Sequence, residues 1–155
     1  MHLNLHTDFG LRVLLYLASS PTGGAAAPDI AQAFDISLNH LRKVVQALAH
    51  AGYVSTARGR TGGITLAREP KDIVVGRVIR DLEPDLALVE CFDPETNACL
   101  IAPCCGLTSA LEEARQSFFD VLDRYTLADV ARNRGALWTL LQRGRARRAL
   151  EQAHP

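Results

Sequence analysis

Apolar residues recur at helical spacing in the first third of the chain. A stripe that starts at Phe9 predicts a helix with Thr7 as its N-cap and its end near Ser19. A turn at residues 21–24 separates this helix from a short one predicted at 29–34. Each helix is expected to turn its apolar face inward.

A third helix is predicted to begin after Ser37, its cap, and to end at Gly52. The residues expected to be buried are Leu38, Leu41, Val45 and Leu48, and those expected to face outward are Asn39, Lys43, Gln46 and His50. Two helices joined by so short a connection, the second with polar side chains outward, predict a helix-turn-helix.

Residues 53–57 and 64–67 are predicted to form two strands joined by the glycine-rich loop 58–63. A hairpin directly after a helix-turn-helix is typical of a wing, and its glycines permit a backbone with positive φ. Arg58 and Arg60 lie in this loop, where we expect them to contact phosphates or the minor groove.

The rest of the chain is predicted to be helical at 75–82, at 107–124 and in a capped turn from Thr126. The longer helix has a heptad-like apolar seam, made of Leu107, Leu111, Ala114, Phe118, Val121 and Tyr125. We favour pairing of this seam with a second subunit over packing within its own domain. Beyond Ala131 the arginine-rich chain is expected to be a mobile or weakly helical tail, which serves either nonspecific DNA affinity or solubility.

Together these elements predict a mainly α protein with a small β wing. Residues 1–84 are assigned to a winged helix-turn-helix DNA-binding domain and 85–106 to a cysteine-rich, cluster-binding loop. Residues 107–131 are assigned to a dimerisation helix with a short following helix, and 132–155 to the arginine-rich tail.

Charge is segregated along the chain, although the formal net charge is zero. From Ile36 to Arg68 there are five Lys and Arg residues and no acidic one, whereas residues 81–114 contain eight carboxylates and no Lys or Arg. A basic stretch confined to one motif is typical of a nucleic-acid reader. The residues expected to contact DNA are Ser37, Asn39, His40, Arg42, Lys43, Gln46, Arg58 and Arg60.

Other classes of protein are disfavoured. No apolar run approaches the roughly 18 residues of a membrane span, and the stretch 11–18 lacks the flanks of a signal peptide, so a cytoplasmic protein is expected. The sequence contains no phosphate-binding loop, zinc-protease motif or nucleophile elbow. We therefore expect that the chain is not an enzyme.

Four cysteines lie within a short segment, at Cys91, Cys99, Cys104 and Cys105. Without an export signal, metal binding or redox chemistry is favoured over disulfides. The gaps are longer than the paired spacing of structural zinc sites, which favours an iron–sulfur cluster, with zinc as the alternative. Adjacent residues of an extended segment point to opposite faces. The predicted ligands are therefore Cys91, Cys99 and Cys105, with Cys104 as a bystander or a redox-active spare.

Several motifs occur in the order of one bacterial regulator family. They are Thr7-Asp-Phe-Gly-Leu-Arg12, Ala51-Gly-Tyr-Val54, Arg58-Gly-Arg-Thr-Gly-Gly-Ile64, Arg80-Asp-Leu-Glu-Pro84, the three cysteines, and Tyr125-Thr-Leu-Ala-Asp129. Over roughly residues 1–140 the chain resembles the NsrR-type nitric-oxide-sensing iron–sulfur repressors of the Rrf-type winged helix-turn-helix family, which also includes IscR.

The resemblance implies a homodimer that binds double-stranded operator DNA and holds one [2Fe–2S] or [4Fe–4S] cluster per subunit. It implies that Asp8 of the partner subunit completes a ligand set of Cys91, Cys99 and Cys105. Carboxylate oxygen is a harder and weaker ligand for iron than thiolate, so this iron is the expected entry point for nitric oxide. The alternative role for Asp8 is an ion pair with Arg12, one helical turn away.

The implied mechanism acts through the spacing of the two subunits. The cluster links the two subunits and fixes the spacing of their recognition helices, which read half-sites about 34 Å apart. Attack by nitric oxide breaks the link and weakens operator binding. The alternative function is a winged-helix regulator that senses iron–sulfur or redox status through the same cysteines, or one that holds a structural zinc.

Overall fold

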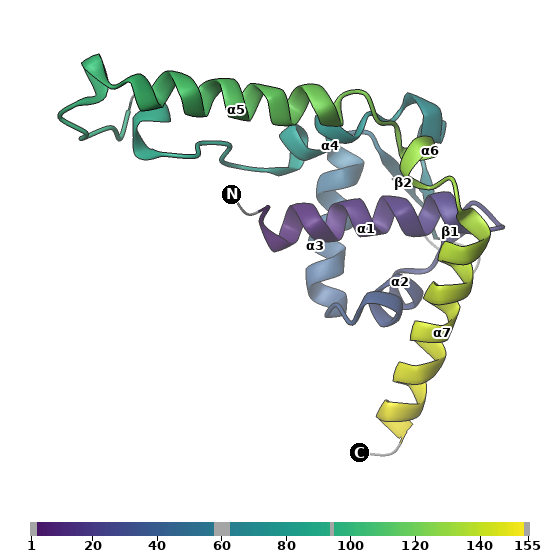
Figure 1. The fold of residues 1–155 in the computed structure, drawn as a ribbon. Helices are drawn as coiled ribbons and strands as arrows, with labels where there is room; N and C mark the ends of the chain where they lie inside the picture. Colours follow the sequence, from purple (N-terminus) through teal and green to yellow (C-terminus); the bar gives the residue numbers. More distant parts are fainter. Residues whose placement is uncertain (1–2, 58–62, 94, 154–155) are drawn as a thin grey trace.

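The computed structural model describes residues 3–57, 63–93 and 95–153, with side chains described as far as residue 150 (Figure 1). The helices are α1 (Leu5–Ser19), α2 (Ala27–Phe34), α3 (Leu38–His50), α4 (Val75–Leu82), α5 (Gly106–Leu122), α6 (Leu127–Val130) and α7 (Arg134–Ala153). The strands are β1 (Gly24–Ala25), β2 (Val54–Thr56) and β3 (Ile64–Leu66). The predicted fold class, mainly α with a small β wing, is confirmed.

The first helix begins earlier than predicted. Asn4, rather than Thr7, is the N-cap of α1, and its side chain accepts a 2.8 Å hydrogen bond from the Thr7 backbone N–H. This bond satisfies a donor that the first turn leaves free, so the helix extends back to Leu5. Thr7 itself is fully buried in the first turn. The predicted cap at Thr7 is therefore wrong.

Other predicted helix ends are confirmed. The Ser37 hydroxyl accepts a 3.2 Å hydrogen bond from the His40 N–H, which caps α3. Gly52 follows this helix with φ of 74°, a left-handed conformation that favours glycine. Thr126 and Asp129 form a complete capping box at the start of α6.

The core lies where α1 packs against α3 and the sheet. Its largest fully buried side chains include Tyr16, Leu14 and Leu17 of α1 and Leu41 and Leu48 of α3. The predicted buried face of α3 is confirmed, except that Leu38 is only half-buried and Val44 is also enclosed. α3, the second helix of the helix-turn-helix and therefore its recognition helix, thus has one face packed in the core and the other exposed.

The predicted hairpin is present and has a third strand. β2 pairs antiparallel with β3, with Val54 opposite Leu66, and β1 pairs with the other edge of β3. The first residue of β1, Gly24, falls in the turn predicted at 21–24, because two residues are too few to show an alternating pattern. The loop tip that contains Arg58 and Arg60 lies outside the described residues.

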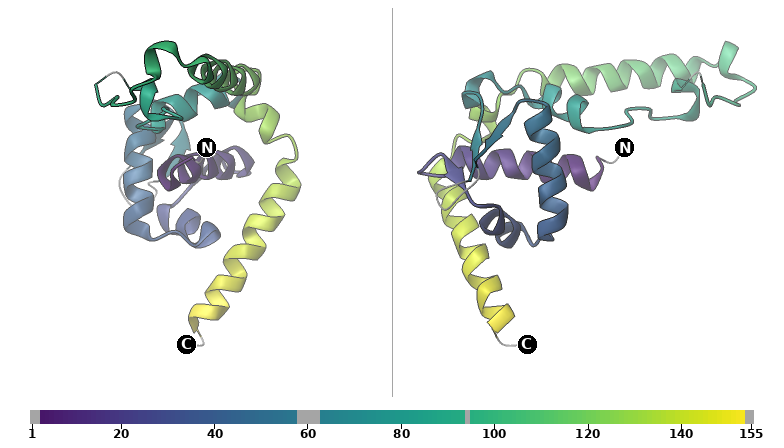
Figure 2. Two further views of the ribbon diagram at one scale, coloured as in Figure 1. Left: turned by 60° about the vertical axis from the view of Figure 1, so that its left-hand side comes forward. Right: turned by 180° about the vertical axis from the view of Figure 1, so that it is seen from behind.

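α5 projects away from the body of the domain, as two further views show (Figure 2). One end of α5 is fixed to α4, because Arg80 makes two hydrogen bonds to Asp123, just after the helix, at 2.7 and 2.8 Å. The cysteine segment runs outward from α4 alongside α5 and joins α5 at its other end (Figure 1).

The arginine-rich segment is a 20-residue helix, α7, that packs against α1 and α2. The prediction of a mobile or weakly helical tail is therefore wrong. The physical reason is an apolar stripe of Leu137, Trp138 and Leu141, which packs on the core between the charged positions. Among the described residues, no helix is long and apolar enough to span a membrane.

Candidate nucleic-acid interface and cysteine site

The outward face of α3 presents the side chains that sequence analysis assigned to DNA contact. Asn39, Arg42, Lys43 and Gln46 are all exposed. Arg42 lies one turn from Asn39, with 3.5 Å between its Nη1 and the amide oxygen. The structure therefore places two cationic and two amide side chains together on one accessible helix face, opposite the face that enters the core.

Ser37 and His40 have structural contacts at the start of the same helix. The Ser37 hydroxyl is occupied in capping. The His40 ring is half-buried and packs edge-on against Phe9 of α1, with 5.0 Å between ring centroids. His40 therefore contributes to the α1–α3 contact, and its remaining surface lies at the edge of the exposed α3 face.

Arg68, which sequence analysis counted only as a basic charge, joins the wing to the end of α3. Its guanidinium lies 4.9 Å from the centroid of the Tyr53 ring, a cation–π contact. It also donates a 3.2 Å hydrogen bond to the Ala51 carbonyl, at the C-cap of α3. Sequence spacing does not predict this contact, because the β2–β3 hairpin separates Arg68 from Tyr53 and Ala51 in the sequence.

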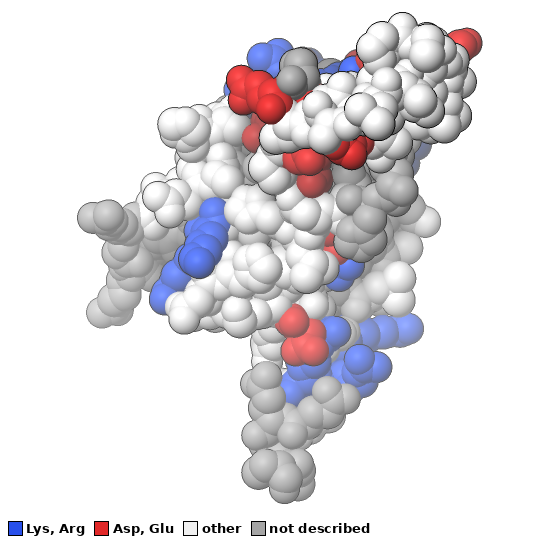
Figure 3. Space-filling model, turned by 90° about the vertical axis from the view of Figure 1, so that its left-hand side faces the viewer, with Lys and Arg blue, Asp and Glu red and all other residues white. Residues whose placement is uncertain are grey.

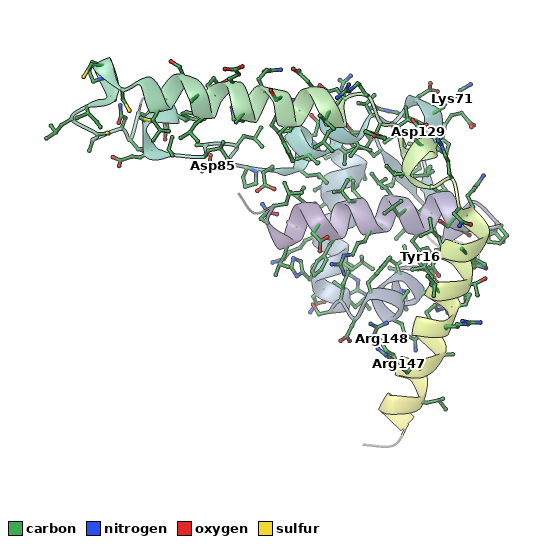
Figure 4. The ribbon with its side chains drawn as sticks, viewed as in Figure 1. Tyr16, Lys71, Asp85, Asp129, Arg147 and Arg148 are labelled. Atoms are coloured by element: carbon green, nitrogen blue, oxygen red, sulfur yellow. The ribbon has the colours of Figure 1, made fainter. Side chains whose placement is uncertain are left out.

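The cysteine segment lies at the projecting end of α5, where the sulfur atoms appear in Figure 4. Cys91, Cys99 and Cys105 are half-buried, whereas Cys104 is exposed. The Cys91 sulfur lies 3.5 Å from the hydroxyl oxygen of Thr108 in α5. Within the described ranges, no three His, Cys, Asp or Glu side chains are grouped closely enough to hold a metal ion. A single chain thus does not assemble the predicted ligand set.

Cys105 occupies the N-cap position of α5. The pKa of its thiol is lowered, first by the nearby Leu107 backbone N–H and then by the N–H and hydroxyl of Thr108. Thr108 therefore neighbours both Cys91 and Cys105. The Cys104 thiol instead lies 3.5 Å from the Ile101 carbonyl oxygen, so the two adjacent thiols have different surroundings.

Asp8 lies near the start of α1, where it forms an ion pair with Arg12 at 2.6 Å. The two side chains are 37% and 42% exposed, so both are accessible to a partner. Arg12 also lies over the Phe9 and Phe34 rings, with 5.7 and 5.9 Å to their centroids. Within this chain, Asp8 has the local ion pair that sequence analysis weighed as the alternative to metal binding.

The predicted apolar seam of α5 is largely uncovered. Leu107 is 62% exposed and Val121 44%, although both are large apolar residues. Tyr125, which the prediction also placed on the seam, lies beyond the end of α5 at Leu122 and is 47% exposed. Leu111 and Phe118 on the same seam are half-buried. A single chain therefore leaves apolar side chains near both ends of this seam in contact with water.

Comparison with known proteins connects these features to one family. The family described as "Rrf2: Iron-dependent Transcriptional regulator" matches residues 3–133. The HTH-type transcriptional regulator NsrR of Bacillus subtilis (strain 168) is 46% identical over 143 residues, which cover 92% of this chain and 98% of that protein. NsrR of Geobacillus kaustophilus (strain HTA426) is 47% identical over 146 residues, covering 94% and 99%.

Solved structures show the same architecture. T. potens IscR is 30% identical with a TM-score of 0.68, covering 86% of this chain and 88% of that one. CymR (YrzC), the global cysteine regulator of B. subtilis, is 28% identical with a TM-score of 0.68, covering 86% and 98%. The relatives are named transcriptional regulators, so the expectation that the chain is not an enzyme is confirmed. This chain belongs to the Rrf2 family of transcriptional regulators and has the winged-helix fold of its solved members.

Proposed function

We propose that this protein is a homodimeric repressor that binds operator DNA and releases it when nitric oxide attacks an iron–sulfur cluster. The observation that carries the DNA-binding part is the exposed polar face of α3 beside the wing. Arg42 and Lys43 have the donors that suit guanine edges, and Asn39 and Gln46 suit adenine. Arg58 and Arg60 of the wing loop add phosphate or minor-groove contacts.

The exposed seam of α5 supports a homodimer. A second copy of the helix buries Leu107, Val121 and Tyr125, which a single chain leaves in water. Pairing two α5 helices also brings two recognition helices into one particle, as a palindromic operator requires. α5 projects from the body of the domain, where a second copy can approach it (Figure 2).

The donor chemistry of the cysteine segment fits an iron–sulfur cluster. Cys91, Cys99 and Cys105 supply three thiolates, and Thr108 already lies beside two of them. Thiolate is the ligand that such clusters favour. The three cysteines lie in irregular chain or short 3₁₀ turns rather than within a long helix. The segment can therefore rearrange around a cofactor without unfolding a helix. The cluster, when bound, supplies the centre at which nitric oxide reacts.

Asp8 of the partner subunit is the proposed fourth ligand. Its exposed carboxylate is held by Arg12 in the single chain, so ligation exchanges one ionic partner for another. In the dimer this side chain ties α1 of one subunit to the cysteine segment of the other. Because α1 packs on α3, the tie also sets where each recognition helix lies. When Asp8 is released, it pairs with Arg12 again. The two recognition helices are then no longer held at the spacing of the operator half-sites.

The DNA-binding part is tested by selecting duplexes from a random-sequence pool and measuring affinity for the selected operator. Arg42→Ala and Lys43→Ala should each weaken binding, by about 1–3 kcal/mol where the side chain contacts a base. Lys71→Ala is the matched control, because it removes an exposed positive charge far from α3 in the region of α6 (Figure 4). Selection of no sequence, or equal loss in all three variants, would contradict the proposal.

The sensor part is tested on protein purified without oxygen. We expect visible absorption with bound iron and acid-labile sulfide, and loss of operator binding as nitric oxide is titrated. Asp8→Ala should alter operator affinity, whereas Glu69→Ala, which removes another exposed acid, should not. Colourless protein that contains no iron or sulfide and still releases DNA when nitric oxide is added would contradict the proposed cluster. An Asp8→Ala variant with unchanged affinity and response would overturn the bridge between subunits.

A further inference from the structure

α7 is held against the helix-turn-helix at several points. Trp138 packs edge-on against Tyr16 of α1, with 5.4 Å between ring centroids. Arg145 pairs with Asp29, in the first turn of α2, at 2.5 Å. Arg148 donates a 2.6 Å hydrogen bond to the Ala33 carbonyl, in the last turn of α2. That bond satisfies a carbonyl which the helix end leaves without an intrahelical donor. α7 is therefore a built-in part of the DNA-binding domain.

At Gly144 the backbone of α7 approaches the last turn of α2, which leads into the turn before α3. A Cβ added there would lie 3.4 Å from the Ala33 carbonyl oxygen. Arg143 and Arg147 flank this point and, four residues apart, share one side of α7. Both are exposed. Their positions are thus fixed beside the turn that leads into the recognition helix.

Positive charge is concentrated on this helix. α7 contains five arginines and one acidic residue, Glu151. Figure 3 shows Lys and Arg side chains gathered at the lower end of the molecule, beside a small acidic group. The acidic side chains of α2 and its C-cap in this region are Asp29, which Arg145 pairs, and Asp35. In Figure 4, Arg148 lies on the side of α7 that faces α2.

The partner that fits this arrangement is the DNA phosphate backbone. A recognition helix enters the major groove, so protein segments beside its N-terminal turn face the strands that border the groove. Arginine binds phosphate oxygens through its planar array of donors. Such contacts position a protein on DNA but carry no sequence information.

We propose that α7 forms a second, sequence-independent DNA contact, in which Arg143 and Arg147 bind phosphates beside each half-site. This contact rests on DNA binding by α3 and extends the interface onto the C-terminal helix. Because each contact neutralises a phosphate, its loss makes the dependence of affinity on salt shallower, by about 0.9 in log–log slope per contact.

The test compares R143Q/R147Q with the full-length wild-type protein at several salt concentrations. Two probes are used, the selected operator duplex and a duplex of arbitrary sequence. We expect weaker binding of both by a similar factor, an unchanged preference between them, and a slope shallower by up to about 1.8 per subunit. R143K/R147K should keep most of the slope, because it retains both charges.

The matched control is R124Q/R134Q, which removes the same charge from two exposed positions away from the α2–α3 turn. Equal thermal midpoints of the variants and wild type exclude misfolding as the cause. An unchanged slope in R143Q/R147Q, or an equal change in the control, overturns the α7 contact while operator binding stands. A wild-type protein that binds neither duplex overturns the DNA-binding proposal itself, and this contact with it.

Discussion

The phenol of Tyr53 donates a 2.6 Å hydrogen bond to the carboxylate of Asp81. Tyr53 lies at the start of the wing and Asp81 in α4. Burial raises the pKa of Tyr53, and the hydrogen bond adds to this effect, so the phenol stays protonated as a donor. The preceding residue, Arg80, pairs with Asp123 just beyond α5. Two neighbouring residues of α4 thus connect the wing to the projecting helix.

Tyr53→Phe should lower the free energy of unfolding by about 1 kcal/mol, because it removes one hydrogen bond to a carboxylate that water reaches. Urea unfolding with an unchanged m-value measures this loss. Asp81→Asn is the matched variant. Its amide oxygen still accepts from the phenol, so we expect a smaller loss. A Tyr53→Phe protein as stable as wild type would show that the bond contributes nothing.

Asp123→Asn tests the pair between α4 and α5 through its pH dependence. The pKa of Asp123 is lowered from 3.8, first because Arg80 donates hydrogen bonds to it. A lowered folded-state pKa stabilises the fold above pH 3.8, and this stabilisation is lost as the pH falls through the folded value. Because the two side chains are 35% and 40% exposed, we expect a difference of about 1 kcal/mol or less at neutral pH.

The measurement for this pair is urea unfolding from neutral pH down to below pH 3.8. The wild type and Asp123→Asn should converge in stability at the acidic end. Glu113→Gln is the control, since it removes an exposed carboxylate from within α5. A stability difference that persists unchanged at the lowest pH would assign the effect to packing rather than to charge.

Gly76→Ala should break the contact between α4 and α5. A Cβ at Gly76 would overlap the Asp123 Oδ1 and lie 3.2 Å from the Asp123 backbone nitrogen. Since Arg80 holds that carboxylate in place, the clash should cost about 1–3 kcal/mol of stability. Gly135→Ala has no atom within 4 Å of the added Cβ and should be neutral or slightly stabilising. Thermal unfolding compares the two, and equal midpoints would contradict the predicted clash.

Cysteine variants should separate the proposed ligands from the additional thiol. Cys105→Ser should lose bound iron and sulfide, because it removes a thiolate from the segment beside Thr108. Cys104→Ser should keep both, because its thiol is exposed and has different neighbours. Iron and acid-labile sulfide are measured after anaerobic purification. Loss in the Cys104 variant, with retention in the Cys105 variant, would reverse the assignment.

Local signals in the sequence determined the helix-turn-helix and most helix boundaries. Ser37 as a cap, Gly52 as a stop, the helix at 75–82 and the capping box at Thr126 were all predicted correctly. Such features depend on hydrogen bonds and side-chain spacing within a few residues, so the order of residues is enough to specify them. The outward polar face of α3 follows from the same periodicity.

Contacts between distant segments were decided only in three dimensions. α7 is a docked helix because Trp138 meets Tyr16 and Arg148 meets the end of α2, across more than a hundred residues of sequence. Likewise, β1 exists because β3 offers it an edge. The residue pattern of α7 does not predict its contacts with α1 and α2, and the pattern of β1 does not predict its pairing with β3. The sequence by itself therefore determined which surfaces are apolar, polar or charged, whereas the tertiary structure decided which of them meet, because packing depends on geometry that local spacing does not contain.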